Sequence, residues 1–167
     1  MKSRVIAVVS VLACIAGTPA FAQQKPMTPD DVAKIKADVI KAANNYLATF
    51  SKQDFKGIAD KVYSHPAIAI NADGVQIIDP VKQAEGMAKN VEAYKKGGWA
   101  SSDFHDPKVC VINANVALMS SVFRRLDKDG KVYMEGAETD LFARTADGWK
   151  MVGLFAHSPS KTIICND

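Results

Sequence analysis

The stretch that decides the fold is Lys108–His157, which reads KVCVINANVALMSSVFRRL, DKDG, KVYMEGAETDLFART, ADG, WKMVGLFAH. It holds three runs rich in β-branched and aromatic residues, and two short breaks separate Lys108–Leu126, Lys131–Thr145 and Trp149–His157. Each break contains Asp-Gly, the pair that best tolerates the positive φ of a hairpin turn. We therefore predict a C-terminal antiparallel meander of three long strands.

Helical patterns precede this meander. Thr28-Pro29-Asp30-Asp31 combines an N-cap residue, a proline at the first helical position and acids at the positive end of the helix dipole. The apolar residues that follow recur every three or four positions and predict one long helix. They are Val32, Ile35, Val39, Ala42, Tyr46 and Phe50. Asp54 starts a second, shorter helix, and Asp79-Pro80 starts a third helix that Gly97-Gly98 ends.

The remaining segments complete an α+β pattern. Ala67–Ile70 and Val75–Ile78 flank Asp73-Gly74, which predicts a small hairpin between the second and third helices. Trp99–Pro107 reads as an aromatic-containing loop, and Asn113-Ala114-Asn115 leaves open whether a bulge interrupts the first long strand.

The N-terminal residues predict an export signal. Lys2 and Arg4 precede an apolar run to Gly17, and Ala20-Phe21-Ala22 is a small-x-small cleavage site. The run is too short for a permanent membrane helix. We expect residues 1–22 to be a signal peptide, residues 23–167 to be one domain, and the protein to be periplasmic or secreted. Cys14 leaves a lipoprotein signal as the alternative.

Composition limits the partners. Removing Lys2 and Arg4 with the signal leaves 19 basic residues against 18 acidic ones. A net charge of +1 argues against nucleic acid or an anionic membrane surface as the main partner. Two cysteines remain, and a Cys110–Cys165 disulfide would pin the C-terminal tail to the sheet edge, although two unpaired cysteines are the alternative. No Cys or His spacing supports a metal site, and we expect no cofactor.

The order of these elements resembles the NTF2-like superfamily, which includes the SnoaL-like polyketide cyclases and the ketosteroid isomerases. The resemblance extends from about Thr28 to Ser158. Its motifs are Tyr46–Phe50, Asp54–Gly57, and Asp147–Trp149 with Leu154–Ser158. It implies a strongly bent, mostly antiparallel sheet wrapped as a cone around the long N-terminal helix, with a pocket on the inner face. In this superfamily the outer face commonly packs against a second subunit.

The last strand supports burial of both faces. Trp149, Met151, Gly153, Phe155 and His157 alternate with Val152, Leu154 and Ala156, and both sets are largely apolar. We expect the first set to face the cone interior and a homodimer to cover the outer face. An outer face that is only half covered is the alternative.

The ketosteroid isomerase pattern suggests catalytic candidates. Tyr46 falls where that family has its oxyanion-hole tyrosine, and Asp140 falls where it has a protonated aspartic acid. The family's general base would fall at Ile70 or Asn71, and neither can take a proton. His157 is then the candidate base. A core tyrosine and an exposed strand aspartate are the alternatives for the first two.

Further residues are candidates for ligand contact. Arg124 and Arg125 point to opposite faces, and one that entered the cone would meet an acid of the next strand or a ligand carboxylate. His65 is expected at the pocket mouth, and Trp99 and Phe104 are expected on a loop over its open end. The predicted ligand-binding residues are Phe50, His65, Trp99, Phe104, Arg124 and Phe155.

Three functions stay open on this interpretation. The first is an exported protein that binds a small hydrophobic or carboxylate ligand in the cone. The second is a cofactor-free lyase, isomerase or cyclase. The third is a non-catalytic dimerisation module whose cone is filled by side chains such as Met87, Met119, Met134 and Met151.

Overall fold

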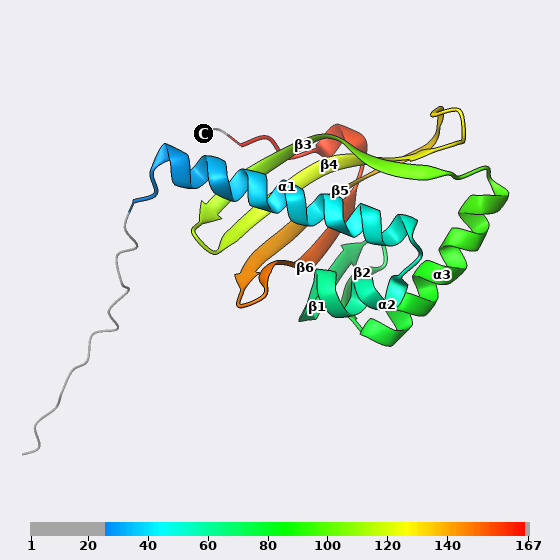
Figure 1. Cartoon of the computed structure of the whole chain (residues 1–167), viewed down its shortest axis with the longest axis horizontal. Helices are drawn as coiled ribbons and strands as arrows, with labels where there is room; N and C mark the ends of the chain where they lie inside the picture. The colour runs from blue at the N-terminus through cyan, green and yellow to red at the C-terminus, as the bar shows by residue number, and fades with distance from the viewer. Residues whose placement is uncertain (1–25, 166–167) are drawn as a thin grey trace, which may run out of the picture.

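The computed structural model describes residues 26–165, in which a long helix lies along one side of a curved sheet (Figure 1). The helical elements are α1 (Pro29–Ser51), α2 (Phe55–Gly57), the π-helical turn η1 (Ile58–Val62), α3 (Pro80–Lys96) and the 3-10 turn η2 (Pro159–Lys161). The strands are β1 (Tyr63–Asn71), β2 (Gly74–Ile78), β3 (Ser101–Asn113), β4 (Val116–Leu126), β5 (Val132–Thr145) and β6 (Gly148–His157).

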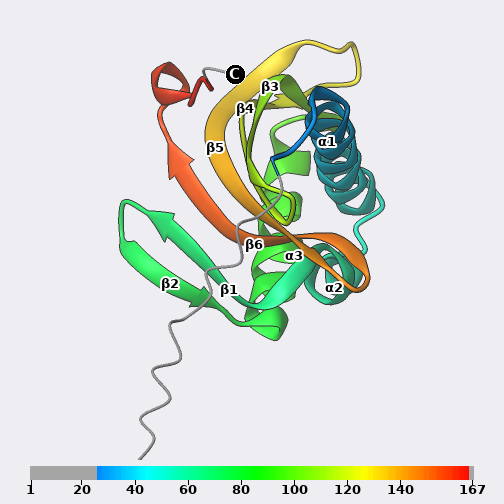
Figure 2. The same ribbon diagram turned by 90° about the vertical axis from the view of Figure 1, so that its left-hand side faces the viewer.

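The six strands form one sheet in the order β2-β1-β6-β5-β4-β3. All neighbours are antiparallel except β1 and β6, which run parallel. Figure 2 shows β5 and β6 curving so that the sheet wraps partly around the helices. The predicted α+β cone, with a mostly antiparallel sheet and a long N-terminal helix, is therefore confirmed. The side that faces α1 is called the concave face below, and the other side the convex face.

Helix α1 begins at the predicted cap. The Thr28 hydroxyl accepts a hydrogen bond from the Asp31 N–H, and the Asp31 carboxylate accepts one from the Thr28 N–H, which completes a capping box. The helix buries one stripe of side chains against the concave face. These are Ile35, Val39, Ala43, Tyr46, Leu47 and Phe50. The last turns of α1 therefore place Tyr46 and Phe50 inside the curve of the sheet.

The prediction of one strand over Lys108–Leu126 is wrong, because a hairpin divides it. Strand β3 ends at Asn113 and β4 begins at Val116, and the two pair antiparallel. The Asn113 Oδ1 accepts a hydrogen bond from the Asn115 N–H at 2.8 Å, which stabilises the turn locally. The asparagines therefore mark a turn, and the meander has four strands.

The loop predicted over Trp99–Pro107 is also wrong from Ser101 onward. Those residues belong to β3, where Ser101 pairs with Leu126 and Phe104 with Phe123. Pro107 lies within β3, which is the edge strand and whose register shifts between His105 and Lys108. An edge strand accommodates a proline at such a bulge because no ladder hydrogen bond is needed there.

A bulge in β6 changes which residues face the cone. Phe142 pairs with Met151, but the next pair is Leu141 with Gly153, so Val152 is an extra residue. Each residue after the bulge lies on the face opposite to the one that simple alternation gives. The expectation that Gly153, Phe155 and His157 face the interior is therefore wrong, and Leu154 takes that position instead.

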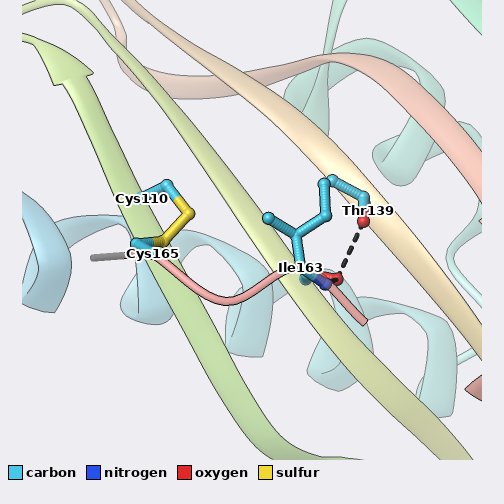
Figure 3. Close-up of a disulfide and its surroundings, with 5 residues drawn as sticks. Cys110, Thr139, Ile163 and Cys165 are labelled. Carbon is cyan, nitrogen blue, oxygen red and sulfur yellow. Dashed lines mark hydrogen bonds between the residues drawn. A yellow bond between two sulfur atoms is a disulfide. The ribbon is translucent and has the colours of Figure 1, made fainter. Parts of the chain in front are cut away.

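The predicted disulfide is present. Cys110 on edge strand β3 is bonded to Cys165, and their Cα atoms lie 5.5 Å apart (Figure 3). The C-terminal tail is thereby tied to the sheet edge, as expected. The predicted signal peptide, residues 1–22, lies outside the described residues. No helix within residues 26–165 is both long and apolar enough to cross a membrane.

Candidate functional site

A cavity of about 360 Å³ opens on the concave side, between the β1–β2 hairpin and α3. Its wall is apolar where Ile77, Ile78, Met87 and Leu154 contribute side chains, and polar where Tyr46, Tyr63, Gln83 and Lys82 do. Elements far apart in the chain meet here, since α1 supplies Tyr46 and β6 supplies Leu154. We call this space the concave cavity.

Two tyrosines line the concave cavity. Tyr46 is 8% exposed and Tyr63 is 3% exposed. Burial raises the pKa of both hydroxyls above the ordinary value of 10, and the charge of Glu138 adds to the effect at Tyr46. Both side chains therefore stay protonated at neutral pH. They offer the cavity hydrogen-bond donors within an apolar surrounding.

Asp140 lies on the same face, in β5, and is completely buried. Neither of its carboxyl oxygens has a hydrogen-bond partner among residues 26–165. Burial first, and then the charge of Glu138, raise the pKa of Asp140 well above its ordinary value. A carboxyl group without a partner in an apolar site is more stable without its charge. The uncharged form of Asp140 is therefore favoured, and the alternative of an exposed strand aspartate is wrong.

Glu138 is a second buried acid, two residues before Asp140 on the same face of β5. Burial raises the pKa of Glu138 to about 7, although Arg125 acts in the opposite direction. From the sequence, Glu138 was only one of the acids of the next strand that an inward arginine could meet. The two-residue spacing of Glu138 and Asp140 could have indicated that both acids lie on one face, because residues two apart in a strand share a face.

The inward arginine is Arg125, so the choice of Arg124 is wrong. The Arg125 guanidinium lies 4.9, 5.1 and 4.9 Å from the ring centres of Phe50, Tyr94 and Phe123. Its Nη1 donates a hydrogen bond to the Ser102 hydroxyl at 2.7 Å. Arg125 is thus held among aromatic rings and does not line the concave cavity.

Arg124 lies on the convex face. Its Nε donates a hydrogen bond to Asp103 at 2.8 Å, and its Nη2 forms an ion pair with the same carboxylate at 2.5 Å. This arrangement lowers the pKa of Asp103. The two neighbouring arginines therefore have different tasks, one in the core and one at the surface.

His157 is not near Tyr46 and Asp140. Because of the bulge at Val152, it lies on the convex face, where its Nε2 is hydrogen-bonded to the Thr139 hydroxyl at 2.9 Å. Its Nδ1 is hydrogen-bonded to the Ser158 carbonyl oxygen. The structure brings Tyr46 and Asp140 to one face and separates His157 from them, together with Phe155.

The other predicted contact residues pack elsewhere. Phe50 and Trp99 meet edge to face at 5.7 Å, and Phe104 stacks against Tyr46 at 6.5 Å. The Trp99 indole N–H donates a hydrogen bond to Ser102. His65 is hydrogen-bonded through Nε2 to the carbonyl oxygen of Ala59. None of these four side chains lines the concave cavity. Phe50 from α1, Trp99 just before β3 and Phe104 from β3 pack in or against the core instead.

Methionines fill only the deep part of the cone. Met119 and Met151 are completely buried against the core, whereas Met87 lies at the edge of the concave cavity. The cone is therefore packed at its base and open near the β1–β2 hairpin. Within residues 26–165, no group of three or more His, Cys, Asp or Glu side chains is arranged to hold a metal ion.

Comparisons with known proteins agree with this geometry. The model of a family described as NTF2-like protein (DUF6841) matches residues 37–159. Aln2 from a Streptomyces species is 15% identical, with a TM-score of 0.61, and the match covers 81% of this chain and 96% of Aln2. Kfla4162 from Kribbella flavida is 14% identical, with a TM-score of 0.59, and 79% and 95% of the two chains are covered.

An assembly domain shares the fold as well. The association domain of Caenorhabditis elegans CaMKII is 14% identical, with a TM-score of 0.55, and the match covers 78% of this chain and 100% of that domain. At these identities the likeness concerns the fold alone. A comparison with curated proteins found no match.

Proposed function

This chain belongs to the NTF2-like family DUF6841, and from that premise we propose that it binds a small, mostly apolar molecule carrying a hydrogen-bond acceptor in the concave cavity. The observation that carries the proposal is the open cavity of about 360 Å³ with Tyr46 in its lining. This volume falls in the range of roughly 300–1,000 Å³ typical of small-molecule sites.

The polar groups favour an acceptor over an anion. The Tyr46 and Tyr63 hydroxyls keep their protons and can donate, and the nearby Asp140 has unused hydrogen-bonding capacity. The lining holds one cation, Lys82, and one carboxylate, Asp79, so it offers an anion no net positive charge. An anion would also approach Glu138, which ionises near neutral pH, and the cation Arg125 is already enclosed by aromatic rings. A ketone satisfies the donors without burying a charge.

Calorimetry on the mature protein tests this proposal with matched probes. We expect 2-tetralone to bind about 3- to 10-fold more tightly than tetralin, because one net hydrogen bond contributes about 0.5–1.5 kcal/mol. The carboxylate 2-naphthoate should bind less tightly than the ketone. In Tyr46→Phe the preference for the ketone over the hydrocarbon should become smaller.

The control is Tyr133→Phe, since the Tyr133 hydroxyl contacts the Tyr94 carbonyl oxygen and lies outside the cavity lining. It should leave the ketone preference unchanged. Absence of tetralone binding, or an unchanged preference in Tyr46→Phe, would contradict the proposed site.

A second candidate function is a cofactor-free isomerase or lyase, favoured by Glu138. This acid titrates near pH 7 and shares a face with Asp140 and with the cavity residue Leu154. A base of this kind could remove a proton next to a ketone, while Tyr46 donates to the developing oxygen anion. Exchange of the C1 protons of 2-tetralone in D₂O, followed by NMR, tests this. The exchange should be faster with protein and lost in Glu138→Gln.

Export is a separate proposal. The Cys110–Cys165 disulfide supports it, because such bonds persist mainly in oxidising compartments. N-terminal sequencing of the protein from its native cells should begin at Gln23. An N-terminus at Met1, or a lipid-modified Cys14, would contradict cleavage after Ala22.

Oligomerisation stays a proposal too. One structural relative is an association domain, which supports the predicted homodimer. Light scattering on the mature protein should give twice the mass of one chain. A mass of one chain at high concentration would contradict the homodimer.

A further inference from the structure

A second hollow lies on the convex face, away from the concave cavity. It has a volume of about 390 Å³ and lies between the sheet and the C-terminal segment Ser158–Cys165, which we call the strap. Its lining consists of Leu118, Thr139, Phe155, His157, Lys161 and Ile163. We call this space the strap groove.

The strap is held at both of its ends. At one end it continues directly from β6, and at the other the Cys110–Cys165 disulfide joins it to β3 (Figure 3). Between them, the Ile163 N–H donates a hydrogen bond to the Ser120 hydroxyl at 3.0 Å. Figure 3 shows the strap crossing over the strands, with Ile163 near Thr139. The groove is therefore formed before any ligand arrives.

The lining combines an apolar surface with positive charge. Leu118, Phe155 and Ile163 are apolar, and the two ionisable lining residues, His157 and Lys161, are both basic. Both ring nitrogens of His157 are already hydrogen-bonded to Thr139 and Ser158. Among residues 26–165, Lys161 has no ion pair or hydrogen bond of its side chain, so its ammonium group is available to a ligand.

We propose that the strap groove binds a single-chain anionic amphiphile of the fatty-acid type. Its carboxylate would pair with Lys161, and its alkyl chain would lie against Leu118, Phe155 and Ile163. The charge of the lining fits this class and opposes a cationic amphiphile with the same chain. From the sequence we expected an arginine inside the cone to pair with a ligand carboxylate. In this proposal Lys161 has that role, on the convex face. This site is independent of the proposed concave cavity.

Calorimetry with sodium decanoate, below its micelle concentration, tests the proposal on the oxidised mature protein. The charge-reversed probe is decyltrimethylammonium. We expect decanoate to bind and the cationic probe to bind at least tenfold more weakly. Lys161→Gln should weaken decanoate about 3- to 5-fold, as expected for one exposed ion pair. Lys128→Gln, on the Asp127–Gly130 turn, should have no effect.

Neighbouring strap residues supply a second matched pair. Ile163 lines the groove, whereas Ile164 is 77% exposed and lies outside it. Ile163→Ser should weaken decanoate about tenfold, and Ile164→Ser should change it less than twofold. Reduction of the disulfide should also weaken binding, because it frees the end of the strap.

Several results would overturn the proposal. One is equal binding of the two charged probes, and another is equal effects of the two isoleucine substitutions. Loss of decanoate binding in Tyr46→Phe would place the ligand in the concave cavity instead. A further result is that decanoate binds neither the wild type nor Ile163→Ser, while the substitution converts a dimer into a monomer. The groove would then be a contact between two copies of the chain.

Discussion

Asp140 is the cross-strand partner of Leu154, and both residues lie on the concave face of the sheet. Leu154 lines the cavity, so the pairing brings a buried acid next to the candidate site. The pairing exists because Val152 is an extra residue that shifts the register of β6 by one position. One bulge thus decides that Leu154 faces the cavity and that His157 does not.

The acid pair should make stability depend on pH. Burial raises the pKa of Glu138 from 4.5 to about 7 and raises that of Asp140 as well, so the folded protein binds these protons more tightly than the unfolded chain. The contribution of Glu138 is fully present below about pH 4.5 and is lost as the pH rises through 7, and that of Asp140 is lost in the same direction. For Glu138 alone the loss is about 3 kcal/mol.

Urea denaturation at pH 5.5 and pH 8 measures this effect. The free energy of unfolding should be higher at pH 5.5, and Glu138→Gln should reduce the difference. The control is Glu135→Gln, an exposed residue of the same strand, which should leave the difference unchanged. Greater stability at pH 8 than at pH 5.5 in the wild type would be inconsistent with a buried neutral pair.

The two neighbouring arginines should respond differently to the same substitution. Arg125→Lys removes a planar guanidinium from among three aromatic rings and from Ser102, so we expect a loss of about 2–3 kcal/mol. Arg124→Lys changes only a surface pair with Asp103 and should cost less than about 1 kcal/mol. Urea denaturation at pH 7 compares them, and equal losses would contradict the assignment of Arg125 to the core.

Gly136 should be required for packing on the concave face. A Cβ atom there would lie 2.2 Å from the Phe123 ring, which is too close for any side chain without movement of the ring. We expect Gly136→Ala to destabilise the protein by about 1–3 kcal/mol. Gly86→Ala, in α3 with nothing within 4 Å, should instead be neutral or stabilising by up to about 1 kcal/mol. Thermal unfolding distinguishes the two, and a stabilised Gly136→Ala would show that Phe123 is positioned differently.

Much of the fold could be predicted from local signals. Thr28, Asp54 and Asp79 are helix caps in the structure as in the sequence, because capping depends on a few adjacent residues. The turns at Gly74, Gly130 and Gly148 also have the positive φ that the Asp-Gly pairs indicated. These features need no knowledge of distant residues.

The site was harder to predict, because it depends on register. The alternation of β6 is correct as far as Met151 and reverses after Val152, and no residue type marks the bulge. Asn113 and Asn115 are compatible with either a turn or a bulge, and only the structure shows that they form a turn. Glu138 can be recognised as a candidate site residue only once the strand pairing shows that its side of β5 is buried.

The disulfide should stabilise the whole fold. It closes a loop with a sequence separation of 55 residues, and a loop of this length contributes about 4 kcal/mol in the chain-entropy model. We expect Cys165→Ser to lower the free energy of unfolding by up to that amount. In the double variant Cys110→Ser/Cys165→Ser, a reducing agent should have no further effect. A single variant as stable as the wild type would show that the tail adds nothing to the fold.

The most direct test of the central claim is an NMR titration of residues 23–167 with 2-tetralone. The account predicts the largest amide shift changes at cavity residues such as Ala69, Gln83, Met87 and Leu154, with little change at Leu118 and Ile163 on the convex face. Saturable changes confined to the first group would support a ligand in the concave cavity. Changes centred on the convex face, or no saturable changes at all, would contradict it.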